Sequence, residues 1–242
     1  MSAKKSRKPV GENIAVGEAS WTFGGDTPGS FNEHVRRSVP FYDESHDLIC
    51  KLSDYFVQDE GTCYELGAST GVLMKKLARR HANRKGVRWV GIDREEAMIE
   101  HARTDDPVEG IEFVVEDLNA YPFEKSDLVV SYCTMQFVSP HVRQDIYNRI
   151  YESLKWGGAL ILFEKVRACD ARFQDMMQTL YADYKLDKGY SPEEIVAKTK
   201  SLKGVLEPFS RQGNLDLLKR AGFVDVMTVF KYICFEGFLA IK

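Results

Sequence analysis

Three carboxylates stand directly after short apolar runs in the first half of the chain. Glu65 lies in "CYELGASTG", Asp93 ends "VRWVGID" and Asp117 ends "IEFVVED". In an open sheet of parallel strands, ligands bind outside the carboxyl ends of the strands, near the switch in strand order. We therefore expect these three side chains to face one ligand. The alternatives are a surface carboxylate at a strand end for Glu65 and a helix N-cap for Asp93.

The turn that follows Glu65 consists of small residues, which let a backbone approach a bound nucleoside closely. Its pattern is E-x-G-x-x-x-G and not the G-x-G-x-x-G of dinucleotide enzymes. Those enzymes place a pyrophosphate on the helix N-terminus, where an acidic neighbour such as Glu65 repels it. A ligand with a positive group fits this turn better. The predicted cofactor-binding residues of the turn are Gly67, Ala68, Ser69 and Gly71.

S-adenosyl-L-methionine carries a sulfonium, an ammonium, a ribose and an adenine, and each of these groups has a candidate partner. Glu65 favours the cationic end of the molecule. Asp93 follows Gly71 at a spacing of about 20 residues, which suits a carboxylate that accepts hydrogen bonds from ribose hydroxyls. Asp117 lies one strand further along, within reach of the adenine amino group. The set predicts an S-adenosyl-L-methionine site.

Composition excludes several other classes. The chain has 242 residues and a formal net charge of −3, so nothing indicates a broad nucleic-acid-binding face. No apolar run is long enough to span a bilayer, and the basic N-terminus lacks the apolar segment of a secretory signal. Five cysteines without a C-x-x-C pair favour free thiols in a reducing cytoplasm. The scattered histidines predict no metal site.

Alternating strand and helix patterns predict the fold from Val39 onward. Parallel strands with right-handed crossovers give an α/β, Rossmann-like, doubly wound sheet. The last two apolar runs, 224–232 and 233–242, are too close for a crossover helix and predict an antiparallel C-terminal hairpin. A helix over 142–156 is expected to stop at the two glycines that follow it.

One stretch of the chain departs from this alternation of strands and helices. Residues from about 167 to 213 carry no convincing strand and predict a helical lid insert over the mouth of the site. Its second helix is expected to begin at Ser191 as N-cap, followed by Pro192. We predict a flexible N-terminal arm over 1–30 and one domain over 31–242.

Several motifs, in order, resemble a known family. The turn, "GIDREEAMIEHAR", "GGALILFEK" and the terminal hairpin resemble class I S-adenosylmethionine-dependent methyltransferases. More narrowly, "RRSVPFYD", "TMQF", "GYSPEEI" and "RAGF" resemble the carboxy-S-adenosyl-L-methionine synthase family, from about residue 31 to the end of the chain. The resemblance implies S-adenosyl-L-methionine as cofactor, S-adenosylhomocysteine as product, and a homodimer whose insert helices reach toward the neighbouring site. It adds cofactor contacts at Tyr42, Arg94 and Leu118 to those at the turn, at Asp93 and at Asp117.

Two positions depart from the family's pattern. Tyr132 stands where the family has an Asn after the fourth strand, and Thr199 stands where it has an Arg that grips the carboxylate of the carboxylated cofactor. Lysine does not reproduce a bidentate guanidinium clamp. We therefore predict ordinary methyl transfer to a small-molecule acceptor, with Tyr132 as the candidate catalytic residue that orients it.

Two rival functions stay open at this point. The first is a carboxy-S-adenosylmethionine synthase that uses prephenate, with a displaced basic residue at Lys198, Lys200 or Arg211. The second is a cofactor-binding subunit without its own chemistry. The acceptor itself, whether amine, carboxylate, hydroxyl or tRNA base, is not fixed by the sequence, although the acidic balance argues mildly against nucleic acid.

Overall fold

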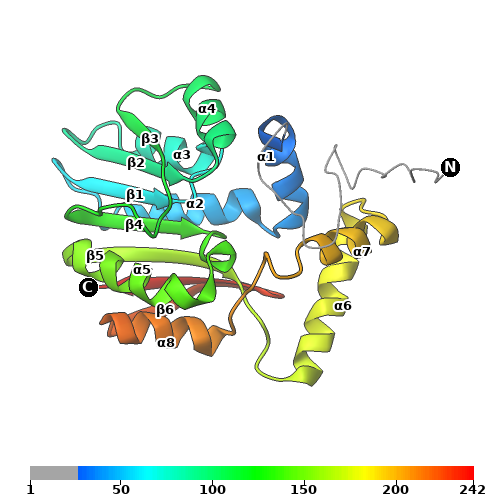
Figure 1. Ribbon diagram of the computed structural model, residues 1–242. Coiled ribbons are helices and arrows are strands. Elements are labelled where there is room, and N and C mark those ends of the chain that lie inside the picture. Colours follow the sequence, from blue (N-terminus) through cyan, green and yellow to red (C-terminus); the bar gives the residue numbers. More distant parts are fainter. Residues whose placement is uncertain (1–26) are drawn as a thin grey trace.

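The computed structural model describes residues 27–242 (Figure 1). Residues 1–26, which hold the basic N-terminal cluster and most of the predicted arm, lie outside the described residues. The last residues of that predicted arm, 27–30, form the first turn of helix α1.

Eight α-helices, one short 3-10 helix and seven strands make up the described chain. The strands are β1 Thr62–Leu66, β2 Arg88–Asp93, β3 Ile111–Val115, β4 Ser126–Tyr132, β5 Leu154–Lys165, β6 Asp225–Tyr232 and β7 Phe235–Ile241. The helices are α1 Thr27–Ser38, α2 Tyr42–Ser53, α3 Val72–Arg80, α4 Glu96–Thr104, η1 Met135–Phe137, α5 Pro140–Ser153, α6 Ala171–Asp187, α7 Pro192–Ser201 and α8 Arg211–Ala221.

The seven strands form one sheet in the order β3-β2-β1-β4-β5-β7-β6. Strands β1 to β5 pair in parallel, whereas β7 pairs antiparallel with both β5 and β6. The strand order reverses between β1 and β4, which is where open α/β sheets bind ligands. This architecture confirms the predicted Rossmann-like sheet with its antiparallel C-terminal hairpin.

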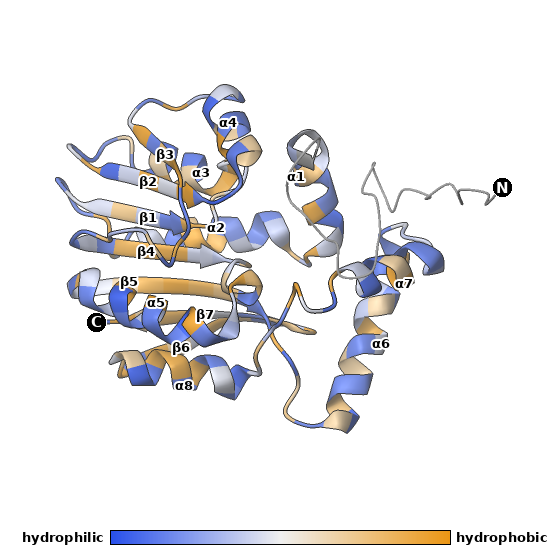
Figure 2. Ribbon diagram, viewed as in Figure 1, coloured by the Kyte–Doolittle hydropathy of each residue, from blue (hydrophilic) through white to orange (hydrophobic). Residues whose placement is uncertain are grey.

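Helices cover both faces of the sheet. One core cluster joins β1, β4 and β5 to α5 and α8, and includes the fully buried Tyr147 and Leu218. The other packs Ile49 of α2 and Leu73 of α3 against the opposite face. Figure 2 shows that β5 is hydrophobic over most of its length and β4 over its middle, as expected for central strands buried on both sides.

Helices α6 and α7 occupy the predicted insert, with α7 near α1 (Figure 1) and the Tyr181 ring of α6 against the Phe235 ring of β7. The Tyr181 hydroxyl of α6 donates to the backbone carbonyl of Ser38 at 2.7 Å, and Arg37 donates to the carbonyl of Lys188 at 3.1 Å. Ser191 caps α7 as predicted, in a capping box with Glu194. The insert is therefore tied to the end of α1, beyond β5.

The predicted end of the fifth long helix is wrong by about one turn. Helix α5 ends at Ser153, and the chain enters β5 at Leu154, before the two glycines. Lys155 forms an ion pair with Asp127 at 2.9 Å, and Gly157 donates its N–H to the carbonyl of Lys242 at 2.8 Å. These pairings with distant segments override the local helix signal.

Two properties of residues 27–242 bear on the class of protein. None of the helices there has the length and apolar character needed to cross a membrane. Within the same residues, no group of three or more His, Cys, Asp or Glu side chains gathers to hold a metal ion.

Candidate active site

The turn after β1 is fixed by backbone bonds and by its glycines. The N–H groups of Gly67 and Ala68 both donate to the carbonyl of Ile92, at 2.8 and 2.9 Å. Gly67 and Gly71 have φ of 70° and 76°, in the left-handed region that favours glycine. A Cβ would lie 2.4 Å from Thr134 at Gly67 and 2.6 Å from the Phe113 ring at Gly71. Packing within the protein therefore requires both glycines, in addition to the close approach of a ligand that the sequence suggested.

Asp93 joins this turn to the start of α4. Its Oδ2 accepts from the N–H of Ser69 at 2.8 Å and its Oδ1 from the N–H of Glu95 at 3.0 Å. Burial raises the pKa of the Asp93 carboxyl above its usual value, although the two backbone hydrogen bonds act in the opposite direction. Each carboxylate oxygen keeps a further lone pair, so Asp93 can accept from ribose hydroxyls without releasing the turn.

Glu65 is a strongly perturbed carboxylate at this edge. Its side chain is 4% exposed, and its Oε2 has no hydrogen-bond partner among residues 27–242. Burial, and to a lesser extent the charge of Asp93, raises the pKa of Glu65 to about 8, against a backbone hydrogen bond from Met74 that lowers it. An unpartnered buried carboxyl oxygen is costly unless a donor or a cation meets it. The site therefore fits the positive end of S-adenosyl-L-methionine.

An aromatic group lies beside these acids. Tyr42 opens α2 and is buried; its ring centroid is 4.1 Å from that of His46 and 5.6 Å from that of Tyr132. Burial raises the pKa of Tyr42 most, and the charge of Glu65 raises it further. Both ring nitrogens of His46 are buried without a partner among the described residues. Electron-rich rings beside an acid are compatible with a sulfonium.

Tyr132 has its hydroxyl occupied by Ser45. The two oxygens lie 2.7 Å apart, and the Ser45 hydroxyl also donates to the carbonyl of Tyr42 at 2.9 Å. Because that carbonyl can only accept, the single proton of Ser45 is committed to it. The Tyr132 hydroxyl is then the donor to Ser45, and its oxygen presents only lone pairs elsewhere.

The remaining predicted contacts lie further out. Asp117 is exposed, and its Oδ1 accepts from the N–H of Asn119 at 2.7 Å. Leu118 is buried in the core on the α5 side of the sheet. Arg94 is exposed and donates to Glu95 at 3.3 Å. The structure thus groups Tyr42, Glu65, Asp93 and the turn closely, whereas Asp117 and Arg94 stand at the solvent edge of the same strand ends.

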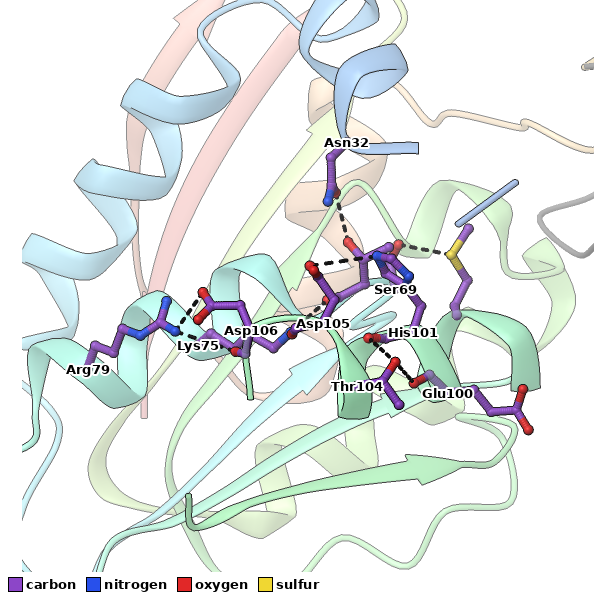
Figure 3. A network of polar contacts seen from close by, with 11 residues as sticks. Asn32, Ser69, Lys75, Arg79, Glu100, His101, Thr104, Asp105 and Asp106 are labelled. Atoms are coloured by element: carbon purple, nitrogen blue, oxygen red, sulfur yellow. Dashed lines mark hydrogen bonds and ion pairs between the residues drawn. The ribbon is translucent and has the colours of Figure 1, made fainter. Parts of the chain in front are cut away.

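Sequence reasoning missed the role of α1, which covers the turn (Figure 3). The Thr70 hydroxyl donates to Asn32 at 2.8 Å, and the Ser69 hydroxyl contacts the Met98 sulfur at 3.6 Å. An open depression of about 650 Å³ lies between α1 and α4. It is lined by Pro28, Gly29, Ala97, Glu100, His101, Arg103 and Thr104. No local pattern signals such a contact, because Asn32 and Thr70 meet only in the folded chain.

The basic residues proposed to replace the family's Arg differ in exposure. Thr199 and Lys200 are exposed, and the Thr199 hydroxyl donates to the carbonyl of Ile195 at 2.8 Å. Arg211 pairs with Glu236 at 2.8 Å. Lys198 alone of the three proposed replacements is buried, with its Nζ 2.8 Å from the Ser38 hydroxyl.

Comparison with known proteins agrees with this geometry. The sequence profile described as "Methyltransferase domain" matches residues 64–158. The chain superposes on human N-acetylserotonin methyltransferase in complex with SAM with a TM-score of 0.62 at 19% identity, covering 89% of this chain and 56% of that one. A possible histamine N-methyltransferase from Thermotoga maritima gives 0.56 at 20% identity, covering 88% of this chain and 95% of that one. These similarities show the fold of class I S-adenosylmethionine-dependent methyltransferases.

Relatives of higher sequence identity define the family within this class. The carboxy-S-adenosyl-L-methionine synthase of Staphylococcus epidermidis is 35% identical over 226 residues, which is 92% of this chain and 97% of the relative. That of Nautilia profundicola is 33% identical over the full length of both chains. The chain belongs to the carboxy-S-adenosyl-L-methionine synthase family, within the class of enzymes whose cofactor is S-adenosyl-L-methionine. The assignment of individual contacts to Tyr42, Glu65, Asp93 and the other predicted residues stays a prediction.

Proposed function

We propose that this enzyme transfers the methyl group of S-adenosyl-L-methionine to a small-molecule acceptor. The observation that carries this choice over carboxyl transfer is Thr199. Its side chain is an exposed hydroxyl bonded to its own helix, and it supplies no positive charge at the position where the family has an Arg. Methyl transfer needs no such charge.

The cofactor supplies a methyl group that is already activated by the sulfonium. In this proposal Glu65 contacts the positive end of the cofactor and Asp93 accepts hydrogen bonds from the ribose hydroxyls. The turn between them positions both side chains. The S–CH₃ bond breaks with its electron pair staying on sulfur, while a lone pair of the acceptor forms the new bond to carbon. The protein mainly holds the acceptor in line with that bond and excludes water. Tyr132 orients the acceptor from the end of β4.

The test is product analysis with the full chain. Incubation with S-adenosyl-L-methionine and a panel of small amines, alcohols and carboxylic acids should yield S-adenosylhomocysteine together with a methylated panel member, both identified by mass spectrometry. Cofactor that stays intact with every class of acceptor, in protein shown by calorimetry to bind it, contradicts the proposal.

A second function, carboxyl transfer from prephenate to the cofactor, is favoured by one specific observation. Lys198 is buried and turned inward, at the residue next to Thr199, and the relatives named above are carboxy-S-adenosyl-L-methionine synthases. Incubation with prephenate should then give a nucleoside heavier by one carboxyl group in place of a hydrogen. An unchanged nucleoside mass removes this alternative.

We further propose a homodimer that works in the cytoplasm. Phe173, Met176 and Leu180 are exposed and follow one face of α6, which supports a partner on that helix. All five cysteines are free, in line with a reducing compartment. Light scattering on wild type and on Leu180→Glu should show a dimer and a monomer respectively; a monomeric wild type contradicts the assembly.

A further inference from the structure

Three lysines from three separate elements gather under the insert. Lys165 ends β5, Lys185 lies in the last turn of α6, and Lys198 lies in α7. The Nζ atoms of Lys165 and Lys185 lie 4.4 and 4.6 Å from the centroid of the same ring, that of Tyr181. Two ammonium groups of like charge therefore meet at one aromatic side chain.

Within residues 27–242, no carboxylate pairs with either ammonium group. Among the described residues, the polar contacts of the Lys165 and Lys185 ammonium groups are those with the Tyr181 ring, and neither group forms an ion pair. Lys185 is only 7% exposed. Lysines are almost never buried to this extent without a partner, and a cation–π contact offsets only part of the desolvation.

The neighbouring charges make the burial of these ammonium groups still less favourable. Burial, and then the charge of Lys165, lowers the pKa of Lys185 to about 8. Burial, and then the charges of Lys185, Lys165 and Arg37, lowers the pKa of Lys198 to about 7. Groups perturbed in this way beside a known site are candidates for ligand binding, because an anion would remove the repulsion.

The lysines lie toward β5, on the Tyr132 side of the candidate cofactor site. The N–H of Cys133, the residue after Tyr132, donates to the carbonyl of Phe163 at 2.7 Å, and Lys165 follows two residues further along β5. Lys165 and Cys133 are also close enough for their charges to act on each other. The acids Glu65 and Asp93 lie at the ends of β1 and β2, on the other side of β4. A molecule between Tyr132 and the lysines would thus be separate from the cofactor's acidic contacts.

We propose that Lys165, Lys185 and Lys198 bind a carboxylate group of the acceptor. The inference rests on the proposed function in one respect, namely that the anion is part of the molecule being methylated. An ammonium cluster binds an anion as a set of point charges, without the bidentate geometry of a guanidinium. The site therefore holds one end of the acceptor, while the rest of the molecule extends past Tyr132 toward the cofactor.

Calorimetry with simple probes tests the site without turnover. Benzoate is the carboxylate probe, benzamide is its neutral counterpart, and inorganic phosphate is the other small anion; all are titrated into the full chain saturated with S-adenosylhomocysteine. We expect benzoate to bind best, and Lys185→Met and Lys165→Met to weaken it about tenfold or more each, the scale of a lost charge-assisted bond. The matched control is Lys203→Met, an exposed lysine of the same insert, which should leave benzoate affinity unchanged.

The outcomes separate this inference from the proposed function. Equal binding of benzamide and benzoate, tighter binding of phosphate, or unchanged benzoate affinity in both buried-lysine variants overturns the carboxylate site. S-adenosylhomocysteine affinity serves as the folding control in every variant. If lysine-dependent benzoate binding holds and no acceptor is ever methylated, the site stands and the proposed function fails.

Discussion

The two sides of the site contain buried charge of opposite sign. On the β1–β2 side, Glu65 is buried with one oxygen unpartnered among the described residues. On the β5–α6 side, Lys165 and Lys185 meet at one ring without a counter-ion. The pKa of Glu65 rises to about 8 and that of Lys185 falls to about 8, so the protein shifts each group toward its neutral form.

This contrast shows how one fold presents two different ligands. Neither charge helps the sheet, since its core is built from apolar residues on both faces. Both charges reduce stability unless a ligand of the opposite sign arrives, a pattern expected of functional sites. A cationic cofactor on one side and an anionic acceptor on the other would relieve both.

The largest effect is expected for Asp93→Ala on the acidic side. The change removes the acceptor for the ribose and also frees the N–H groups of Ser69 and Glu95. We expect S-adenosyl-L-methionine to bind about a hundredfold more weakly, the scale of two lost hydrogen bonds to a charged group. Calorimetry measures it, with Glu109→Ala, an exposed carboxylate, as control. Wild-type affinity in the Asp93 variant would remove the ribose assignment.

Glu65 should make cofactor binding depend on pH. Its raised pKa, about 8, means that the free protein holds a proton there below pH 8, whereas a cation favours the ionised form. Binding should therefore release a proton, and affinity should rise with pH up to about 8, by at most tenfold per pH unit. In Glu65→Gln the profile should be flat. A wild-type affinity that is constant between pH 6 and pH 8 contradicts this role.

On the basic side, the predicted effect is on the free energy of unfolding. Lys185→Met removes a buried charge and keeps an unbranched apolar chain, so we expect the free protein to gain about 1 kcal/mol of unfolding free energy near pH 7. Lys185 is faced by Lys165 from β5, by Cys234 from the turn before β7 and by the Tyr181 ring of its own helix. The Lys203→Met variant, at an exposed lysine, is the control.

That gain should shrink as the pH rises. The folded pKa of Lys185, about 8, lies below the ordinary value, so between pH 8 and about 10 the unfolded state binds more protons and wild type gains relative stability. Denaturant unfolding at several pH values measures the difference. A variant less stable than wild type at pH 7 would show that the lysine is structural.

The two sides also differ in how much of them a sequence reveals. The strand ends could be predicted, because Glu65 and Asp93 follow apolar runs whose period and length indicate parallel strands. The lysine cluster could not, because Lys185 and Lys198 sit in helices whose charged residues are normally solvated. Only the folded chain brings α6 and α7 against Ser38. The contact between Thr134 and Gly67 is equally nonlocal. It explains why a side chain is excluded at Gly67, which the turn motif alone does not explain.

The smallest effect on cofactor affinity is expected where the two sides meet, at Tyr132. Tyr132→Phe removes a hydroxyl that donates to Ser45 and leaves its ring against Tyr42 and His46. We expect cofactor affinity to change by less than about threefold, since no direct cofactor contact of that oxygen is needed, and kcat to fall about tenfold through poorer acceptor orientation. Steady-state kinetics with the panel member that proves to be the acceptor measures kcat, and calorimetry measures the cofactor affinity.

Ser45→Ala separates orientation from packing in that prediction. It removes the partner of the Tyr132 hydroxyl while keeping the phenol, whose proton is then free to point elsewhere. If Tyr132 acts through an oxygen that presents only lone pairs, Ser45→Ala should lower kcat by a similar factor, and the double variant should be no worse than Tyr132→Phe alone. Additive losses would mean that the two hydroxyls act independently. Unchanged kcat in both single variants would leave Tyr132 as a packed aromatic between the cofactor and acceptor sides.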